Sequence, residues 1–99
     1  QISGSTEDVM PLESIRERWT AFGWDVLETN GDDIAHLVKT FDDINFKNSH
    51  PHLIISDTTK GYGVSFMENV AKWHHGVPTE EQYQQAVSEI TNRIEQLKD

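Results

Sequence analysis

Residues 24–56 read WDVLETNGDDIAHLVKTFDDINFKNSHPHLIIS, and this stretch decides the fold. Its first six residues, Trp24–Thr29, have the mixed alternation of a short strand. At its end, His52–Ser56 is apolar on both faces, as buried strands of parallel sheets tend to be. Two such strands joined through a helical segment predict a βαβ unit with parallel strands, and therefore the α/β class.

The residues between the two strands supply a turn and a helix. The pair Asn30-Gly31 is a turn signal directly after the first strand. Asp32 or Asp33 can cap the following helix, because a side-chain oxygen there accepts an N–H of the first turn. The apolar residues of this helix form one stripe: Ile34, Leu37, Val38 and Phe41. We therefore expect the crossover helix in the region Asp32–Phe46.

Helices are also expected on both sides of this unit. Pro11 can open a helix, since its missing N–H has no partner in a first turn, and Gly23 is placed as the C-terminal stop. Residues 58–64 form a glycine-punctuated loop, and residues 65–78 show no period and predict irregular structure. Thr79 and Gln82 have the spacing of a capping box. A long final helix follows, with an apolar face of Tyr83, Ala86, Val87, Ile90, Ile94 and Leu97.

Charge and composition limit the partners and the location. The chain has 99 residues, 8 basic and 17 acidic, and a net charge of -9. A surface of this sign repels phosphate backbones and anionic headgroups, which argues against nucleic-acid and membrane partners. The absence of cysteine excludes disulfides and thiolate metal sites. The longest apolar run, Leu53–Ile55, is too short to span a bilayer and no signal-peptide pattern opens the chain, so we expect a cytoplasmic protein.

The first residues predict that the chain is a piece of a longer protein. Gln1 is not an initiator residue, and Gln1–Thr6 reads as a loop entered from an upstream segment. Ninety-nine residues suffice for one small domain and not for two. The alternative is a whole small domain produced on its own.

Five histidines invite a metal-binding interpretation. His50 and His52 are two residues apart, but Pro51 between them favours a loop-to-strand transition. No carboxylate lies at a spacing that completes a ligand set with them, so a structural role is favoured for both. His36 falls on the polar side of the crossover helix, where solvation is its expected role.

His74 and His75 stand in a different context, because glycine and proline follow them in the segment Trp73–Pro78. Gly76 lets the backbone approach a ligand closely, and a histidine there can donate to phosphate oxygens. From the residues alone, a ligand role for one of the two histidines and a purely structural role remain equally open.

The loop Lys60–Gly63 follows the carboxyl end of a predicted parallel strand, which is where open α/β sheets bind ligands. Gly61 and Gly63 resemble a phosphate cradle, although the Walker and dinucleotide-binding patterns are absent. A tight turn with a solvated lysine is the alternative.

Five stretches, taken in order, resemble transketolases, especially the short two-subunit bacterial type. They are Gly4–Met10, Trp19–Val26, Asn30–Asp33, Lys60–Asn69 and Lys72–Gly76, so the resemblance covers nearly the whole chain. It identifies residues 1–99 as the C-terminal portion of a thiamine-diphosphate-binding domain. The implied fold is a partial doubly wound parallel α/β sheet with a long C-terminal helix. Deoxyxylulose-phosphate synthase, a related thiamine enzyme, shares the glycine loop and a late histidine but matches the rest less well.

The resemblance implies thiamine diphosphate and Mg²⁺ as cofactors of the complete enzyme. In the family the metal is held by an Asp of a Gly-Asp-Gly motif, by an Asn further on, and by a backbone carbonyl. The chain has no such motif, and the Asn and carbonyl positions would fall just before Gln1. The glutamate that activates the cofactor belongs to a different domain or subunit. The resemblance therefore implies no metal ligand in this chain and an inactive isolated fragment.

Three site residues are carried over by the resemblance. His75, in a His-Gly-x-Pro context, matches the family's active-site histidine, which reaches the diphosphate and the bound donor sugar. His74 is the extra member of the pair and receives no role. Lys60 matches a position beside the cofactor that is Ile in many long transketolases and Lys in the short type, and Gly61 follows it in the same cofactor-binding loop.

The activity implied by the resemblance is transfer of a two-carbon ketol unit between sugar phosphates. It implies a homo- or hetero-oligomer containing the missing N-terminal part of the domain and the pyrimidine-binding domain or subunit. The competing hypothesis is a non-enzymatic acidic α/β module that docks onto a partner through its apolar faces.

Overall fold

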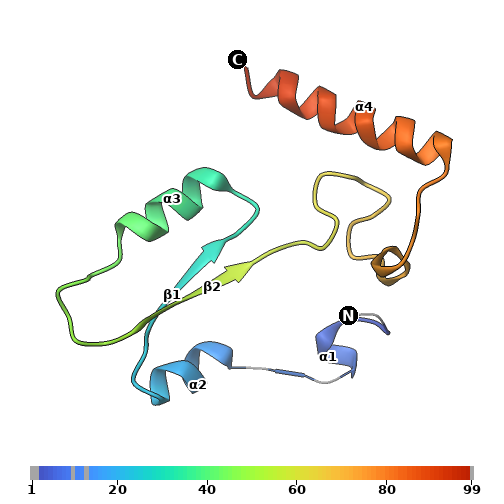
Figure 1. Cartoon of the computed structure of the whole chain (residues 1–99). Helices are drawn as coiled ribbons and strands as arrows, with labels where there is room; N and C mark the ends of the chain where they lie inside the picture. The colour runs from blue at the N-terminus through green and yellow to red at the C-terminus, as the bar shows by residue number, and fades with distance from the viewer. Residues whose placement is uncertain (1–2, 10, 13, 99) are drawn as a thin grey trace. The chain divides into compact units, whose positions relative to one another are not determined.

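The computed structural model describes residues 3–9, 11–12 and 14–98. The chain forms two compact units: residues 6–58, called the strand unit, and residues 59–99 with residues 1–5, called the loop unit. Figure 1 labels the helices and strands in chain order. Gln1 and Ile2, with which the expected opening loop starts, lie outside the described residues, and its last residue begins the short helix α1 (Thr6–Val9).

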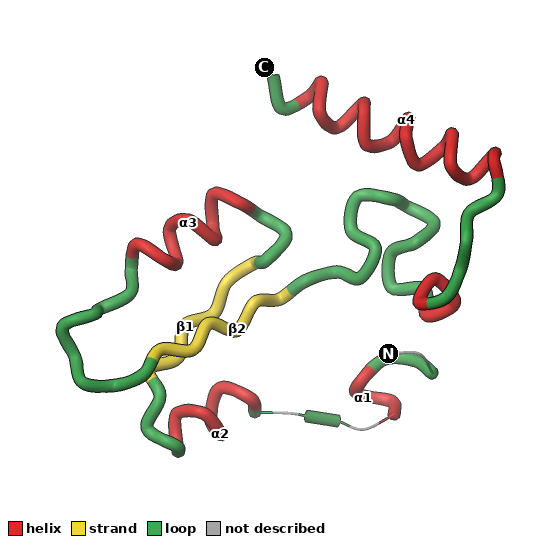
Figure 2. The backbone as a smooth tube through the Cα atoms, in the orientation of Figure 1, coloured by secondary structure: helices red, strands yellow, loops and turns green. Residues whose placement is uncertain are grey.

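Two parallel strands form the sheet of the strand unit. β1 (Asp25–Asn30) and β2 (His52–Asp57) pair along their whole length, and they are the yellow segments in Figure 2. The helix α3 (Ile34–Asp42) connects them. The predicted βαβ unit, its parallel strands and the α/β class are therefore confirmed. Val26 on β1 is only 8% exposed and provides the buried apolar contact of this unit.

The crossover helix α3 is capped as its sequence predicts, and it packs on β1 through polar groups. Asp33, rather than Asp32, is the N-cap, and its carboxylate accepts the N–H of His36 at 3.1 Å. The hydroxyl of Thr40 lies 2.8 Å from the His36 carbonyl and 2.9 Å from the hydroxyl of Thr29. Both threonines are buried, whereas Ile34, Val38 and Phe41 of the apolar stripe are exposed. A pair of hydroxyls thus makes the buried contact between helix and strand.

The helix before β1 is shorter than expected. It is α2 (Ile15–Ala21), so the prediction that Pro11 opens it is wrong. Ser14, directly before α2, has a φ of 61° in the left-handed region, and this interrupts the helical backbone after Pro11. The predicted stop is confirmed, because Gly23 follows the C-cap with a φ of 88°.

The loop unit contains one long helix, α4 (Glu80–Gln96), which begins with the predicted capping box. The hydroxyl of Thr79 accepts the N–H of Gln82 at 3.3 Å, and the Gln82 side chain accepts the N–H of Thr79 at 2.9 Å. One 3-10 turn, η1 (Ala71–His74), lies in the stretch expected to be irregular. The apolar face of α4 is exposed at Tyr83, Val87, Ile90, Ile94 and Leu97. Of the helices that the structure describes, none is long and apolar enough to cross a membrane.

Candidate functional site

Residues 60–69 form a closed loop in the loop unit, called the site loop. Gly61 and Gly63 have φ values of 76° and 96°, which turn the backbone through the left-handed region. Asn69 also has a positive φ, 56°, and its N–H donates to the carbonyl of Lys60 at 2.9 Å. This hydrogen bond closes the base of the loop and holds Lys60–Gly61 next to Asn69.

Gly61 is required by space as well as by conformation. A methyl group at this position would lie 2.6 Å from the carbonyl oxygen of Met67 and 2.9 Å from its Cβ. The far side of the site loop therefore packs directly onto the Gly61 backbone. Only a residue without a side chain permits this approach, which leaves the backbone of Gly61 as the group that a ligand meets.

A cavity of about 470 Å³ lies within the loop unit beside the base of the site loop. Its lining residues are Gly4, Ser5, Lys60, Gly61, Met67, Asn69, Val70, Ala71, Trp73 and His74. Among the described residues, the lining includes a lysine and a histidine and no carboxylate, although the chain as a whole has a net charge of -9. Such a lining suits an anionic ligand, because a cation attracts it and no like charge repels it.

Two of the three site residues expected from the resemblance lie on this cavity, and the third is beside it in sequence. Lys60 and Gly61 are lining residues, whereas His74 takes the place expected for His75. The two imidazole rings meet edge to face, with centroids 4.7 Å apart and planes at 77°. The structure thus brings Lys60, Gly61 and His74 together and adds His75 through its neighbour.

The tryptophan before the histidine pair fixes the backbone on either side of it. The indole N–H of Trp73 donates to the carbonyl of Phe66 at 3.0 Å, which ties η1 to the site loop. A methyl group at Gly76 would lie 2.7 Å from the Trp73 ring, so the chain after the histidines must pass closely over the indole. The pair therefore sits between two backbone segments that Trp73 contacts.

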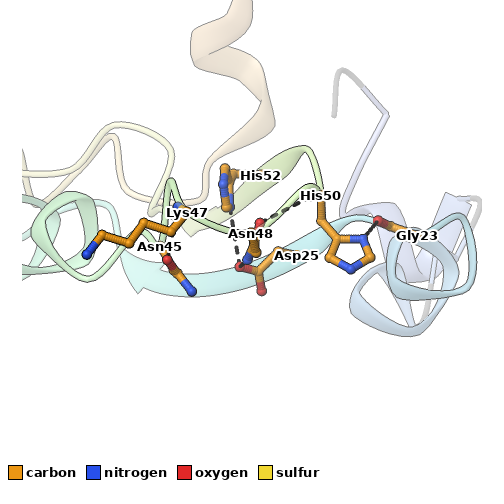
Figure 3. A network of polar contacts seen from close by, with 7 residues as sticks. All are labelled: Gly23, Asp25, Asn45, Lys47, Asn48, His50 and His52. Atoms are coloured by element: carbon orange, nitrogen blue, oxygen red, sulfur yellow. Dashed lines mark hydrogen bonds and ion pairs between the residues drawn. The ribbon is translucent and has the colours of Figure 1, made fainter.

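The remaining histidines connect elements of the strand unit, as Figure 3 shows for two of them. His52 Nδ1 lies 3.3 Å from the carboxylate of Asp25, and these residues are register partners on β2 and β1. His50 Nδ1 lies 3.1 Å from the carbonyl of Gly23. His36 was expected to be solvated, but its Nδ1 also accepts the N–H of Asn30 at 3.0 Å, because α3 begins beside the end of β1.

The amide of Asn48 completes the network of Figure 3, since it donates to the Asp25 carboxylate at 3.1 Å. These contacts give the strand-unit histidines the structural role that their sequence context favoured. Within the described part of the chain, no three His, Cys, Asp or Glu side chains come together as a metal site.

Sequence reasoning missed the residues that contact the site loop from α4. Glu89 accepts two hydrogen bonds from Ser65, and Arg93 contacts Tyr62. Their spacing of four residues shows that they share one helix face. No local pattern in the sequence indicates which distant loop that face meets.

Comparison with known proteins agrees with the motifs. A family described as transketolase, thiamine diphosphate binding domain, matches residues 1–93. One of the two subunits of the apulose-4-phosphate transketolase of Phocaeicola vulgatus is 64% identical over 98 residues, which are 99% of this chain and 35% of that protein. The subunit of the same name from Actinobacillus succinogenes is 39% identical over 91% of this chain and 32% of its own length.

A third relative is the 6-deoxy-6-sulfo-D-fructose transketolase subunit SqwG of a Clostridium species. It is 34% identical over 91% of this chain and 33% of its own length. The chain thus spans about a third of the length of these relatives. The family match extends over nearly all of the chain, including the site loop, the histidine pair and most of α4. The chain belongs to the transketolase thiamine-diphosphate-binding-domain family.

Proposed function

We propose that the complete protein is one subunit of a transketolase and that the cavity of the loop unit receives the diphosphate end of thiamine diphosphate. The observation that carries this proposal is the lining of the cavity. Lys60 supplies a cation, Gly61 an open backbone and His74 a donor, with no carboxylate among the described lining residues, in a strongly acidic chain of this family. The same donor set would be difficult to explain in an acidic docking module.

The residues fit an anionic cofactor in both charge and space. The ammonium group of Lys60 can neutralise part of the diphosphate charge, and this attraction is strongest where the cavity excludes water. Gly61 has the close packing on Met67 that keeps side chains away from its exposed face. Thiamine diphosphate, when bound, supplies the nucleophilic carbon and the electron sink for ketol transfer.

His75 is proposed as the catalytic histidine of the complete enzyme. An imidazole titrates near neutral pH, so it can donate to a phosphate or sugar oxygen and exchange a proton with a sugar hydroxyl. Its ring contacts that of His74. We propose that His74 supports the ring of His75 from the cavity side and that His75 reaches the donor sugar.

The other components of the reaction lie outside this chain in our proposal. Mg²⁺ would be held by residues of the complete protein that precede this segment, and the activating glutamate would come from a second subunit. The relatives are named as subunits of transketolases, which supports a partner chain in the complete enzyme. The name of the 64% identical relative makes apulose 4-phosphate the first donor to test. We place the complete enzyme in the cytoplasm.

The proposal is tested by ketol transfer and calorimetry on the complete subunit mixed with its partner. Lys60→Ala should raise KM for thiamine diphosphate about tenfold, since one charge contact with the phosphate is lost. Lys47→Ala removes the same charge from an exposed position of the strand unit and should leave KM unchanged. Equal KM values for wild type and the Lys60 variant would contradict the assignment of the cavity.

The isolated 99-residue chain provides a second test. It should bind thiamine diphosphate with Mg²⁺ weakly or not at all, because Mg²⁺ needs a near-octahedral set of oxygen ligands. Calorimetry of the chain should therefore detect no tight site. Micromolar affinity would show that the metal ligands lie inside the chain, against the proposal.

A further inference from the structure

One face of α4 contacts the tip of the site loop through a carboxylate. The two oxygens of Glu89 accept the backbone N–H and the hydroxyl of Ser65, each at 2.7 Å. The two residues are 24 positions apart in the sequence, so this is a tertiary contact. Gln85, one turn earlier on α4, donates to the same carboxylate at 2.9 Å and limits its rotation. A carboxylate that accepts two donors of one residue defines both the position and the direction of that residue.

A second contact from the same face lies one turn further along α4. The guanidinium carbon of Arg93 lies 4.2 Å from the centroid of the Tyr62 ring, and an Arg93 N–H donates to the Tyr62 hydroxyl. Cation–π attraction and the hydrogen bond act on one aromatic side chain. Glu89 and Arg93 together hold both ends of the segment 62–65 of the site loop.

The geometry of the loop connects this segment to the cavity. Residues 62–65 join Lys60–Gly61 to Met67–Asn69, and both of these flanking pieces contribute to the lining. The base of the loop is closed by the hydrogen bond between the Asn69 N–H and the Lys60 carbonyl. With α4 holding the tip, the loop is restrained at two opposite points, so neither side of the cavity wall can move independently.

We propose that Glu89 and Arg93 are positioning residues that hold the site loop in its cofactor-binding form. They touch the loop and not the cavity, so their effect on the cofactor passes through Ser65 and Tyr62. This inference rests on the proposed function, because it names what shapes the proposed diphosphate site. The physical basis is preorganisation: a loop already held in place loses less conformational freedom when the anion binds.

The test uses the complete subunit with its partner and compares Glu89→Ala with Glu95→Ala. Glu95 is an acidic residue on the same helix whose ion pair is with Lys98 and not with the loop, so it is a matched control. Glu89→Ala should raise KM for thiamine diphosphate about five- to thirtyfold, since hydrogen bonds to a charged group are lost, while kcat at saturating cofactor stays within about twofold. Glu95→Ala should change neither constant.

A double-mutant cycle with Ser65→Ala shows whether the effect passes through the loop. If Glu89 acts on the cofactor through Ser65, the double variant should lose less affinity than the two single losses combined. Additive losses would overturn the proposal. Arg93→Ala should likewise raise KM, whereas Tyr62→Phe, which keeps the ring, should preserve part of the restraint.

Hydrogen exchange separates this proposal from the proposed function. The backbone amides of residues 62–69 should exchange faster in Glu89→Ala and in the milder variant Glu89→Gln, which guards against misfolding of the former. A lower melting temperature with unchanged exchange and unchanged KM would show a merely structural role and overturn the inference. If the wild type bound no thiamine diphosphate, the proposed function would fail, and the exchange experiment would still decide whether α4 holds the loop.

Discussion

The replacement Gly61→Ala tests the site loop at its most constrained point. Alanine at a φ of 76° costs about 1–2 kcal/mol, because its Cβ approaches the following carbonyl in the left-handed region. The new methyl group would also lie 2.6 Å from the Met67 carbonyl oxygen, so the loop has to open there. Opening endangers the Asn69–Lys60 hydrogen bond, which contributes about another 0.5–1.5 kcal/mol. The sum, about 2–3 kcal/mol, corresponds to a roughly 30- to 150-fold loss of cofactor affinity.

The matched control is Gly23→Ala. Gly23 has a similar φ, 88°, but a methyl group there would meet nothing within 4 Å, and the residue belongs to the strand unit. Gly23→Ala should therefore lower stability by the conformational cost alone and leave cofactor affinity unchanged. Calorimetry with thiamine diphosphate and Mg²⁺ on the complete subunits, with thermal melts beside it, distinguishes the two. Wild-type affinity in a folded Gly61→Ala variant would refute the reasoning.

Three other predictions concern the histidine pair, α3 and the response to acid. His75→Ala in the complete enzyme should lower kcat/KM about ten- to a thousandfold, or about 1.4–4 kcal/mol, and His74→Ala should do less; the reverse order in ketol-transfer assays would move the catalytic role to His74. Thr40→Val should reduce the free energy of unfolding by about 1–3 kcal/mol, because it leaves a buried hydroxyl on β1 without its partner, and denaturant titration measures this. Hydrogen bonds from Ser65 lower the pKa of Glu89 from 4.5, so its contribution is complete above pH 4.5 and is lost as the pH falls through the lowered pKa. Amide exchange in residues 62–69 should accelerate over that acid range, and an exchange pattern independent of pH there, after correction for intrinsic rates, would count against the contact.

The candidate site was predictable where a residue type carries its own signal. The glycines of the loop Lys60–Gly63 indicated left-handed turns, and both adopt them. The pair His74-His75 stood out because glycine and proline follow it. Which of the two rings reaches the cavity was not predictable, because adjacent residues point in different directions according to the local backbone. The 3-10 turn η1, which sets those directions, gave no periodic signal in the sequence.

The sequence by itself determined the elements whose interactions are local. The Asp33 cap and the Thr79–Gln82 capping box each join residues three positions apart, so a short pattern contains the whole interaction. The parallel pairing of β1 and β2 also followed from the pattern, since a helical crossover between two strands brings the second back in the direction of the first. Family membership followed for a related reason, because its motifs lie in contiguous stretches.

Only the tertiary structure decided the contacts between residues far apart along the chain. The Thr29–Thr40 pair replaces the apolar stripe as the buried contact of α3, because the helix turns its polar side to β1. The left-handed Ser14 delays the start of α2, which no propensity of serine indicates. The hydrogen bonds between Ser65 and Glu89 depend on where a loop and a helix meet after 24 residues of chain. Local rules reach about one helical turn, and such contacts lie beyond that range.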